Sequence, residues 1–102
     1  MVVYLMTNAV TSLDSALHAI ANPTRRRILG ALKQHSAVGK NNGLCAGDIE
    51  EGVHLSQPTI SHHMAILTQA GLVEAAKQGQ WRWYRRDEKA LRRLVKNLRS
   101  QL

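Results

Sequence analysis

Apolar residues recur at helical spacing along most of the chain and predict a largely helical fold. A first helix is expected from residue 11 or 12. A second begins after Asn22, which can cap it, with Pro23 at its first position. A loop rich in Gly and Asn is predicted over residues 36–43, followed by a short helix over about 46–53. The apolar faces of the first two helices consist of Leu13, Leu17, Ile20, Ile28, Leu29 and Leu32.

The clearest helix spans about residues 56–70, where Ile60, Met64 and Leu67 form one apolar stripe. Ser56 is a good residue to precede this helix. Its hydroxyl is expected to accept a hydrogen bond from a backbone N–H two or three residues later. The stripe predicts that one side of the helix packs into the core.

The opposite side of this helix carries short polar groups and no charge. No Asp, Glu, Lys or Arg occurs between residues 57 and 70, although solvated helix faces are usually rich in Lys and Glu. Uncharged donors and acceptors suit the base edges in a DNA major groove. The residues expected to read bases are Gln57, Thr59, Ser61 and His62. His63 borders the apolar stripe and is expected to pack inside the protein.

After Gly71, which is expected to end the helix, the pattern predicts a β-hairpin. Strands over residues 72–77 and 80–86 flank Gln78-Gly79, a two-residue connection suited to a hairpin. Alternation divides the second strand into one face with Trp81, Trp83 and Arg85 and another with Arg82, Tyr84 and Arg86. The apolar count favours tryptophans that face inward.

A last helix is predicted over about residues 87–101, with an apolar seam of Leu91, Leu94, Val95, Leu98 and Leu102. The formal charge of the chain is +7. All of this excess lies in residues 77–102, where nine basic residues accompany two acidic ones. Such a basic region commonly indicates nucleic-acid binding, and less often an anionic membrane surface. The simpler interpretation is the solubility of a small basic protein.

The length of 102 residues predicts a single domain, small enough that a partner subunit would help to bury apolar surface. No apolar run reaches the roughly 18 residues that span a bilayer. The first six residues lack the basic start and the length of a signal peptide. The one cysteine excludes an intramolecular disulfide and fits a reducing cytoplasm. The sequence therefore predicts a cytoplasmic protein.

The predicted order is helix, helix, short helix, recognition helix, hairpin and helix. This is a mainly α fold with a small β-hairpin: a winged helix-turn-helix flanked by N- and C-terminal helices. Three segments, in order and at the expected separations, resemble the ArsR/SmtB family of small winged-helix repressors. They are LHAIANPTRRRILGAL at 17–32, LSQPTISHHMAILTQAGLV at 55–73 and GQWRWYRR at 79–86. The resemblance covers most of the chain, about residues 13–98.

The resemblance implies a homodimer that binds inverted repeats in promoters and leaves the DNA when an inducer binds. It also implies that the terminal helices hold the dimer, with an interface at Leu13, Leu17, Leu91, Leu94, Val95 and Leu98. The wing is expected at about 72–86. In the wing the family pattern would bury the face of Tyr84, so which hairpin face packs inward stays open. Contacts to phosphate are expected from Ser56, Arg25, Arg26, Lys77, Gln78, Gln80 and Arg82. For the run 25–27, a solvated helix start is an equal alternative.

The chain departs from the family at its usual metal sites. The thiolate site resembles the sequence ELCVCDL, whereas this chain has GLCAGDI at residues 43–49. Cys45 is therefore kept and Gly47 replaces the second cysteine. One thiolate per chain cannot supply the three or four ligands of a soft-metal site. The last helix also lacks the histidine of the other family site. We expect no metal and no cofactor, and Cys45 is either a half-buried side chain or a one-cysteine redox switch.

The leading hypothesis is a dimeric, sequence-specific DNA-binding repressor that does not sense metal. The first alternative is a repressor of the same fold that responds to metal or thiol chemistry through Cys45 and histidines. The second is a protein-interaction module that binds an acidic partner through the basic last helix and exposed tryptophans. An enzyme is not expected, because the chain shows no nucleophile paired with a base, no carboxylate pair and no phosphate-cradling glycine loop.

Overall fold

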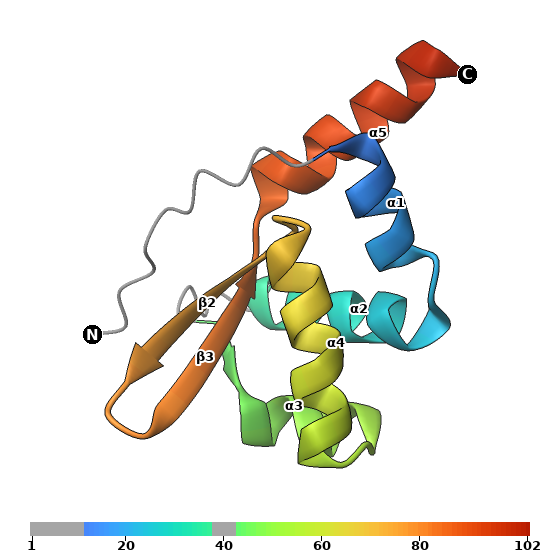
Figure 1. Cartoon of the computed structure of the whole chain (residues 1–102). Helices are drawn as coiled ribbons and strands as arrows, with labels where there is room; N and C mark the ends of the chain where they lie inside the picture. The colour runs from blue at the N-terminus through green and yellow to red at the C-terminus, as the bar shows by residue number, and fades with distance from the viewer. Residues whose placement is uncertain (1–11, 38–42) are drawn as a thin grey trace.

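The computed structural model describes residues 12–37 and 43–102, excepting the side chains of residues 34–37 (Figure 1). In chain order the elements are α1 (Leu13–Ile20), α2 (Pro23–Ala37), β1 (Leu44–Cys45), α3 (Ala46–Val53), α4 (Gln57–Gln69), β2 (Val73–Gln78), β3 (Trp81–Arg86) and α5 (Glu88–Gln101). The helices and the β2–β3 hairpin follow the predicted order. The fold is mainly helical with a small antiparallel sheet, which confirms the predicted class.

Side-chain caps begin three of the helices, and the sequence predicts one of these caps, Asn22. The backbone N–H of Arg25 donates to Asn22 Oδ1 at 3.1 Å, so α2 starts at Pro23 as expected. Ser12 caps α1 and Asp87 caps α5 in the same way. Each cap satisfies an N–H that has no partner inside its helix. The predicted loop at 36–43 is wrong at its start, because α2 continues to residue 37; residues 38–42 lie outside the described chain.

The end of α4 depends on Gly71, which has a φ of 77°. Its N–H donates to the Thr68 carbonyl at 3.0 Å, and the N–H of Leu72 donates to the Leu67 carbonyl at 3.1 Å. These two bonds form a Schellman motif, which requires a left-handed residue that glycine adopts without a Cβ penalty. Gly71 therefore stops the helix and directs the chain into β2, as predicted.

The sheet has three antiparallel strands in the order β1-β3-β2. The short strand β1 was not predicted, since two residues carry no periodic signal. Gln78 pairs with Trp81, so the hairpin connection is Gly79-Gln80. The predicted connection, Gln78-Gly79, was wrong by one residue. Gly79 has a φ of 60° at the first loop position, as the first central residue of a type II′ turn requires.

Tyr84 faces the core and is only 4% exposed, whereas Trp81 is 58% exposed. The inward tryptophans favoured by the apolar count are therefore wrong, and the alternative from the family pattern is confirmed. The reason is β1: Leu44 lies opposite Tyr84 and is buried on the same side. Arg86 also lies on the Tyr84 face, and its guanidinium donates to the Leu29 carbonyl at 3.2 Å and to Glu88 Oε1 at 3.1 Å.

The largest fully buried side chains come from α2, α3, α4 and the start of the hairpin: Ile28, Ile49, Ile60, Met64, Leu67 and Leu72. Helices α1 and α5 pack against each other on one side of the molecule, and the hairpin projects from another (Figure 1). On α5, Leu94 is buried and Val95 is 57% exposed, and Leu102 at the C-cap of this helix is fully exposed. No helix in the described part of the chain is long and apolar enough to cross a membrane.

Candidate nucleic-acid interface

Helix α4 presents two chemically distinct faces. Ile60, Met64 and Leu67 are at most 1% exposed and pack into the core. The solvent-exposed side includes, in the N-terminal half of the helix, the polar residues Gln57, Thr59, Ser61 and His62. Packing of the apolar stripe therefore fixes the direction in which the polar face points. These four side chains offer hydrogen-bond donors and acceptors without net charge.

The N-terminus of α4 differs from the predicted cap. Ser56 occupies the cap position, but its hydroxyl makes no bond to the helix backbone; it lies 2.9 Å from Thr59 Oγ1 instead. The second helical residue is Pro58, which has no N–H to offer. Backbone N–H groups of the first turn are consequently left without a side-chain cap. A helix N-terminus in this state attracts anions such as phosphate.

The tip of the hairpin is strongly basic. Lys77 and Arg82 lie directly opposite each other on β2 and β3, and both are exposed. Like charges at directly opposed positions destabilise a sheet, since their side chains repel. Within the described chain, the ion pairs of the hairpin are Arg85–Glu74 and Arg86–Glu88, and neither neutralises the tip. The exposed Gln78 and Gln80 complete a surface that suits an anionic partner.

The three consecutive arginines of α2 bind the C-terminal ends of other helices. Arg26 Nη1 donates to the Ile20 carbonyl at 2.7 Å, and Arg27 Nη2 donates to the Val53 carbonyl at 3.1 Å. Arg25 is 6% exposed and donates to the carbonyls of His18 and Ala19. The prediction that Arg25 binds phosphate is therefore wrong, because its guanidinium is buried and engaged. Arg26 and Arg27 remain exposed.

Arg25 also reaches helix α4. Its Nη1 lies 3.2 Å from His63 Nδ1, so one side chain joins α1, α2 and α4. His63 is half-buried, which confirms that it packs inside, whereas His62 is exposed. Burial lowers the pKa of His63 below its ordinary 6.5, and the neighbouring Arg25 and His62 lower this pKa further.

This Arg25–His63 contact was missed in the sequence, although a signal for it exists. Arg25, Ile28, Leu29 and Leu32 stand at i, i+3, i+4 and i+7, so Arg25 lies on the apolar stripe of α2. A charged residue on such a stripe is buried when the protein folds. It therefore needs hydrogen-bond or ionic partners, because an unpaired buried charge destabilises the fold. The partners, however, come from helices that the sequence alone cannot place.

Cys45 is half-buried and its thiol donates to Asp48 Oδ2 at 3.0 Å. Burial raises the pKa of this thiol, and the Asp48 carboxylate raises that pKa further. A high pKa keeps the group as a thiol, the less nucleophilic form. Of the two roles considered for Cys45, the quiet half-buried side chain fits this environment better than the redox switch.

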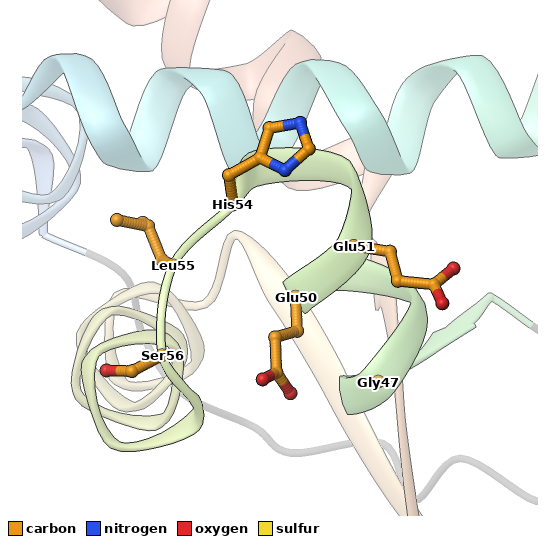
Figure 2. A pocket seen from close by; sticks show the side chains of 6 residues that line it. All are labelled: Gly47, Glu50, Glu51, His54, Leu55 and Ser56. Atoms are coloured by element: carbon orange, nitrogen blue, oxygen red, sulfur yellow. The ribbon is translucent and has the colours of Figure 1, made fainter.

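An open pocket of about 600 Å³ lies at the turn between α3 and α4. Figure 2 shows Glu50, Glu51 and His54 around it, with the two carboxylates pointing in different directions. His54 has a φ of 56° and sets the sharp turn between the two helices. Across the described residues, no three His, Cys, Asp or Glu side chains are grouped to hold a metal ion.

Comparisons with known proteins agree with this geometry. Residues 22–75 match the family model described as bacterial regulatory protein, arsR family. The transcriptional repressor SdpR of Bacillus subtilis is 39% identical over 72 residues, which cover 71% of this chain and 72% of that protein. The arsenical resistance operon repressor of Staphylococcus aureus is 35% identical over 86 residues, covering 84% of this chain and 76% of that one.

A solved structure shows the same fold. The crystal structure of a possible transcriptional regulator for arsenical resistance superposes with a TM-score of 0.70 at 32% identity, covering 84% of this chain and 82% of that chain. The matched family model covers more than half of the residues and includes the whole α3–α4 unit. The chain therefore belongs to the arsR family of bacterial regulatory proteins and is a DNA-binding transcriptional regulator, not an enzyme.

Proposed function

We propose that the protein is a homodimeric repressor that binds an inverted-repeat operator in the cytoplasm and does not sense metal. The observation that carries this proposal is the combination of an exposed, uncharged polar face on α4 with a basic, exposed hairpin tip. A face without carboxylates can approach phosphates closely and still offer donors and acceptors to bases. The buried stripe of the same helix holds that face in one orientation.

Different parts of the surface are proposed to contact the bases and the phosphates of DNA. Helix α4 enters the major groove, where Gln57, Thr59, Ser61 and His62 contact base edges. Phosphates are bound by the hairpin tip, the N-terminus of α4 and the start of α2, through Lys77, Gln78, Gln80, Arg82, Ser56 and Arg26. Arg26 also donates a hydrogen bond to the Ile20 carbonyl.

The dimer is supported by the apolar face of α5. Residues 91, 95, 98 and 102 follow each other at spacings of four, three and four, as in a helix–helix seam. Val95 and Leu102 on this seam are exposed, and Leu91 and Leu98 are only partly buried. Leu13 and Leu17 of the adjacent α1 are also partly buried. A second copy on this face would cover these residues. A dimer that reads an inverted repeat presents its two recognition helices to successive turns of DNA, about 34–36 Å apart.

Metalloid sensing is the second candidate, because two of the similar proteins are named for arsenical resistance. Arsenic-type ligation requires several thiolates. This chain has one cysteine, and its thiol is held protonated by burial and by Asp48. We therefore favour a different inducing signal.

The experiment that tests the proposal is binding of the purified protein to the DNA upstream of its own gene. The operator and a shuffled duplex of equal length are compared in a salt series, with and without zinc or arsenite. We expect selective binding that weakens steeply with salt and does not respond to zinc or to arsenite. Equal affinity for both duplexes would refute sequence-specific binding. Release by arsenite in the wild type, abolished by Cys45→Ser, would establish the metalloid alternative.

A further inference from the structure

The buried guanidinium of Arg25 links three helices of the described chain, α1, α2 and α4. Arg25, in the first turn of α2, donates through Nε to the Ala19 carbonyl and through Nη2 to the His18 carbonyl at 3.1 Å. Its remaining nitrogen, Nη1, lies 3.2 Å from His63 Nδ1 on α4. No carboxylate of the described residues pairs with Arg25. Instead of a carboxylate, the carbonyl groups at the C-terminal end of α1, which is the negative end of the helix dipole, interact with the guanidinium.

The contact determines the protonation state of His63. A guanidinium has donors and no acceptor, so Nδ1 must accept the hydrogen bond and the ring proton must lie on Nε2. A doubly protonated imidazole has no free lone pair on Nδ1. It would also place a second positive charge 3.2 Å from Arg25. The contact therefore exists only while His63 is neutral.

The charged groups around His63 do not compensate for this repulsion. From α2 it faces Arg25, and on α4 its ring lies 5.4 Å from that of His62. Helix α1 presents backbone carbonyls to Arg25, while the His18 side chain is exposed. Of the other elements packed on α4, α3 carries Glu50 and Glu51 at the open pocket, and Glu74 on β2 pairs with Arg85.

We propose that Arg25 and His63 are positioning residues that hold the recognition helix α4 against α1, and that protonation of His63 breaks this contact and weakens DNA binding. The proposal rests on the proposed role of α4 as the helix that reads DNA. His63 lies beside His62 on that helix, so a change in the contact acts directly on the base-reading face. Through α1, the same contact reaches the side of the molecule proposed to form the dimer.

The direction in which DNA affinity changes with pH distinguishes this mechanism from direct attraction between a protonated histidine and phosphate. Folding lowers the pKa of His63 below 6.5, so the unfolded chain takes up the proton first as the pH falls. The stabilisation from neutral His63 is therefore present above pH 6.5 and is lost as the pH falls from about 6.5 through the folded-state pKa. Protonation of an exposed histidine near phosphates has the opposite consequence, since added positive charge strengthens DNA binding.

The test measures operator affinity by fluorescence anisotropy from about pH 7.5 to about pH 5.5 at constant ionic strength, with each variant compared with its own affinity at the higher pH. The wild-type affinity is expected to fall up to about tenfold, the change that a one-unit pKa difference between free and bound protein produces. His63→Asn places a non-titrating acceptor near the Nδ1 position, and its operator affinity should no longer fall on acidification. His18→Gln, which removes an exposed histidine, should retain the wild-type fall.

Arg25→Lys keeps the charge but has one nitrogen, which cannot serve both α1 and His63. Its operator affinity at pH 7.5 should be lower and should not fall on acidification, and a thermal melt checks that it folds. NMR titration of the His63 ring, without DNA, should give a wild-type pKa below 6.5, and Arg25→Gln, which removes the positive charge beside the ring, should raise this pKa toward 6.5. A wild-type affinity that stays level or rises on acidification, or an unchanged fall in His63→Asn, would overturn the inference.

The two measurements also separate the inference from the proposed function. If the NMR titration depends on Arg25 but no duplex is bound selectively, the contact stands and the operator-binding function fails. If the operator is bound selectively and the affinity does not depend on His63, the function stands and the positioning role fails.

Discussion

Removing the side chain of Arg82 is expected to weaken binding to every DNA duplex by a similar factor. Arg82 is exposed at the hairpin tip, opposite Lys77 and without an ion-pair partner among the described residues, so Arg82→Ala should leave the fold intact. Each phosphate that a basic side chain neutralises contributes about 0.9 to the slope of log affinity against log salt concentration. A dimer carries two copies of Arg82, and its salt slope should therefore become shallower by about 1.8.

The same relation gives the expected reduction in affinity. Relative to 1 M salt, one neutralised phosphate contributes about 0.7 log unit of affinity at about 0.15 M salt. Without the two Arg82 side chains of a dimer, binding should therefore weaken about thirtyfold at that salt concentration. Gln57→Ala should instead weaken the operator complex by about 1–3 kcal/mol for each base that Gln57 reads, with little change for a shuffled duplex.

The assay is fluorescence anisotropy at four salt concentrations with the operator and with a shuffled duplex. Arg99→Ala is the matched control for removal of a positive charge, because it lies in the last turn of α5, far from the hairpin tip (Figure 1). An unchanged salt slope in Arg82→Ala would show that this side chain binds no phosphate. If Arg82→Ala affected the operator alone and Gln57→Ala weakened both duplexes equally, the two assigned roles would be reversed.

Three further predictions concern stability and assembly. Met64→Ala removes a side chain with 0% exposure and should lower the free energy of unfolding in urea by about 2–5 kcal/mol; a decrease below about 1 kcal/mol would contradict tight packing there. Gly71→Ala forces a φ of 77° on a residue with a Cβ and should cost about 1–2 kcal/mol, whereas Gly30→Ala, with open space inside α2, should stabilise the protein by about 0.5–1 kcal/mol. Val95→Glu should shift the protein to monomers in analytical ultracentrifugation and the exposed Lys96→Glu should not; equal dimerisation of both variants would exclude the α5 seam as the interface.

Much of the DNA-binding unit could be predicted from local signals. The stripe of Ile60, Met64 and Leu67 defined both the buried and the exposed face of α4, because helical spacing alone relates these positions. Asn22 marked the start of α2 and Gly71 marked the end of α4. Both could be predicted because the capping hydrogen bonds join residues within about one helical turn of each other. The short helix α3 was predicted with the bounds that the structure has.

The errors occurred where local signals compete. Ser56 was expected to bond the backbone, but Pro58 removes one of the two N–H groups it could reach, and the hydroxyl turns to Thr59. The hairpin connection moved by one residue, because two-residue turns are compatible with a left-handed glycine at either loop position.

The sequence by itself determined the order of the elements, the polar face of α4 and the concentration of positive charge after residue 76, since these depend on neighbours within a few residues. Only the tertiary structure decided that Tyr84 faces the core, because strand β1 closes that side of the sheet with Leu44. It also decided the role of Arg25, whose contact with His63 spans 38 residues. Such contacts are selected by the packing of whole helices, which short-range periodicity does not encode.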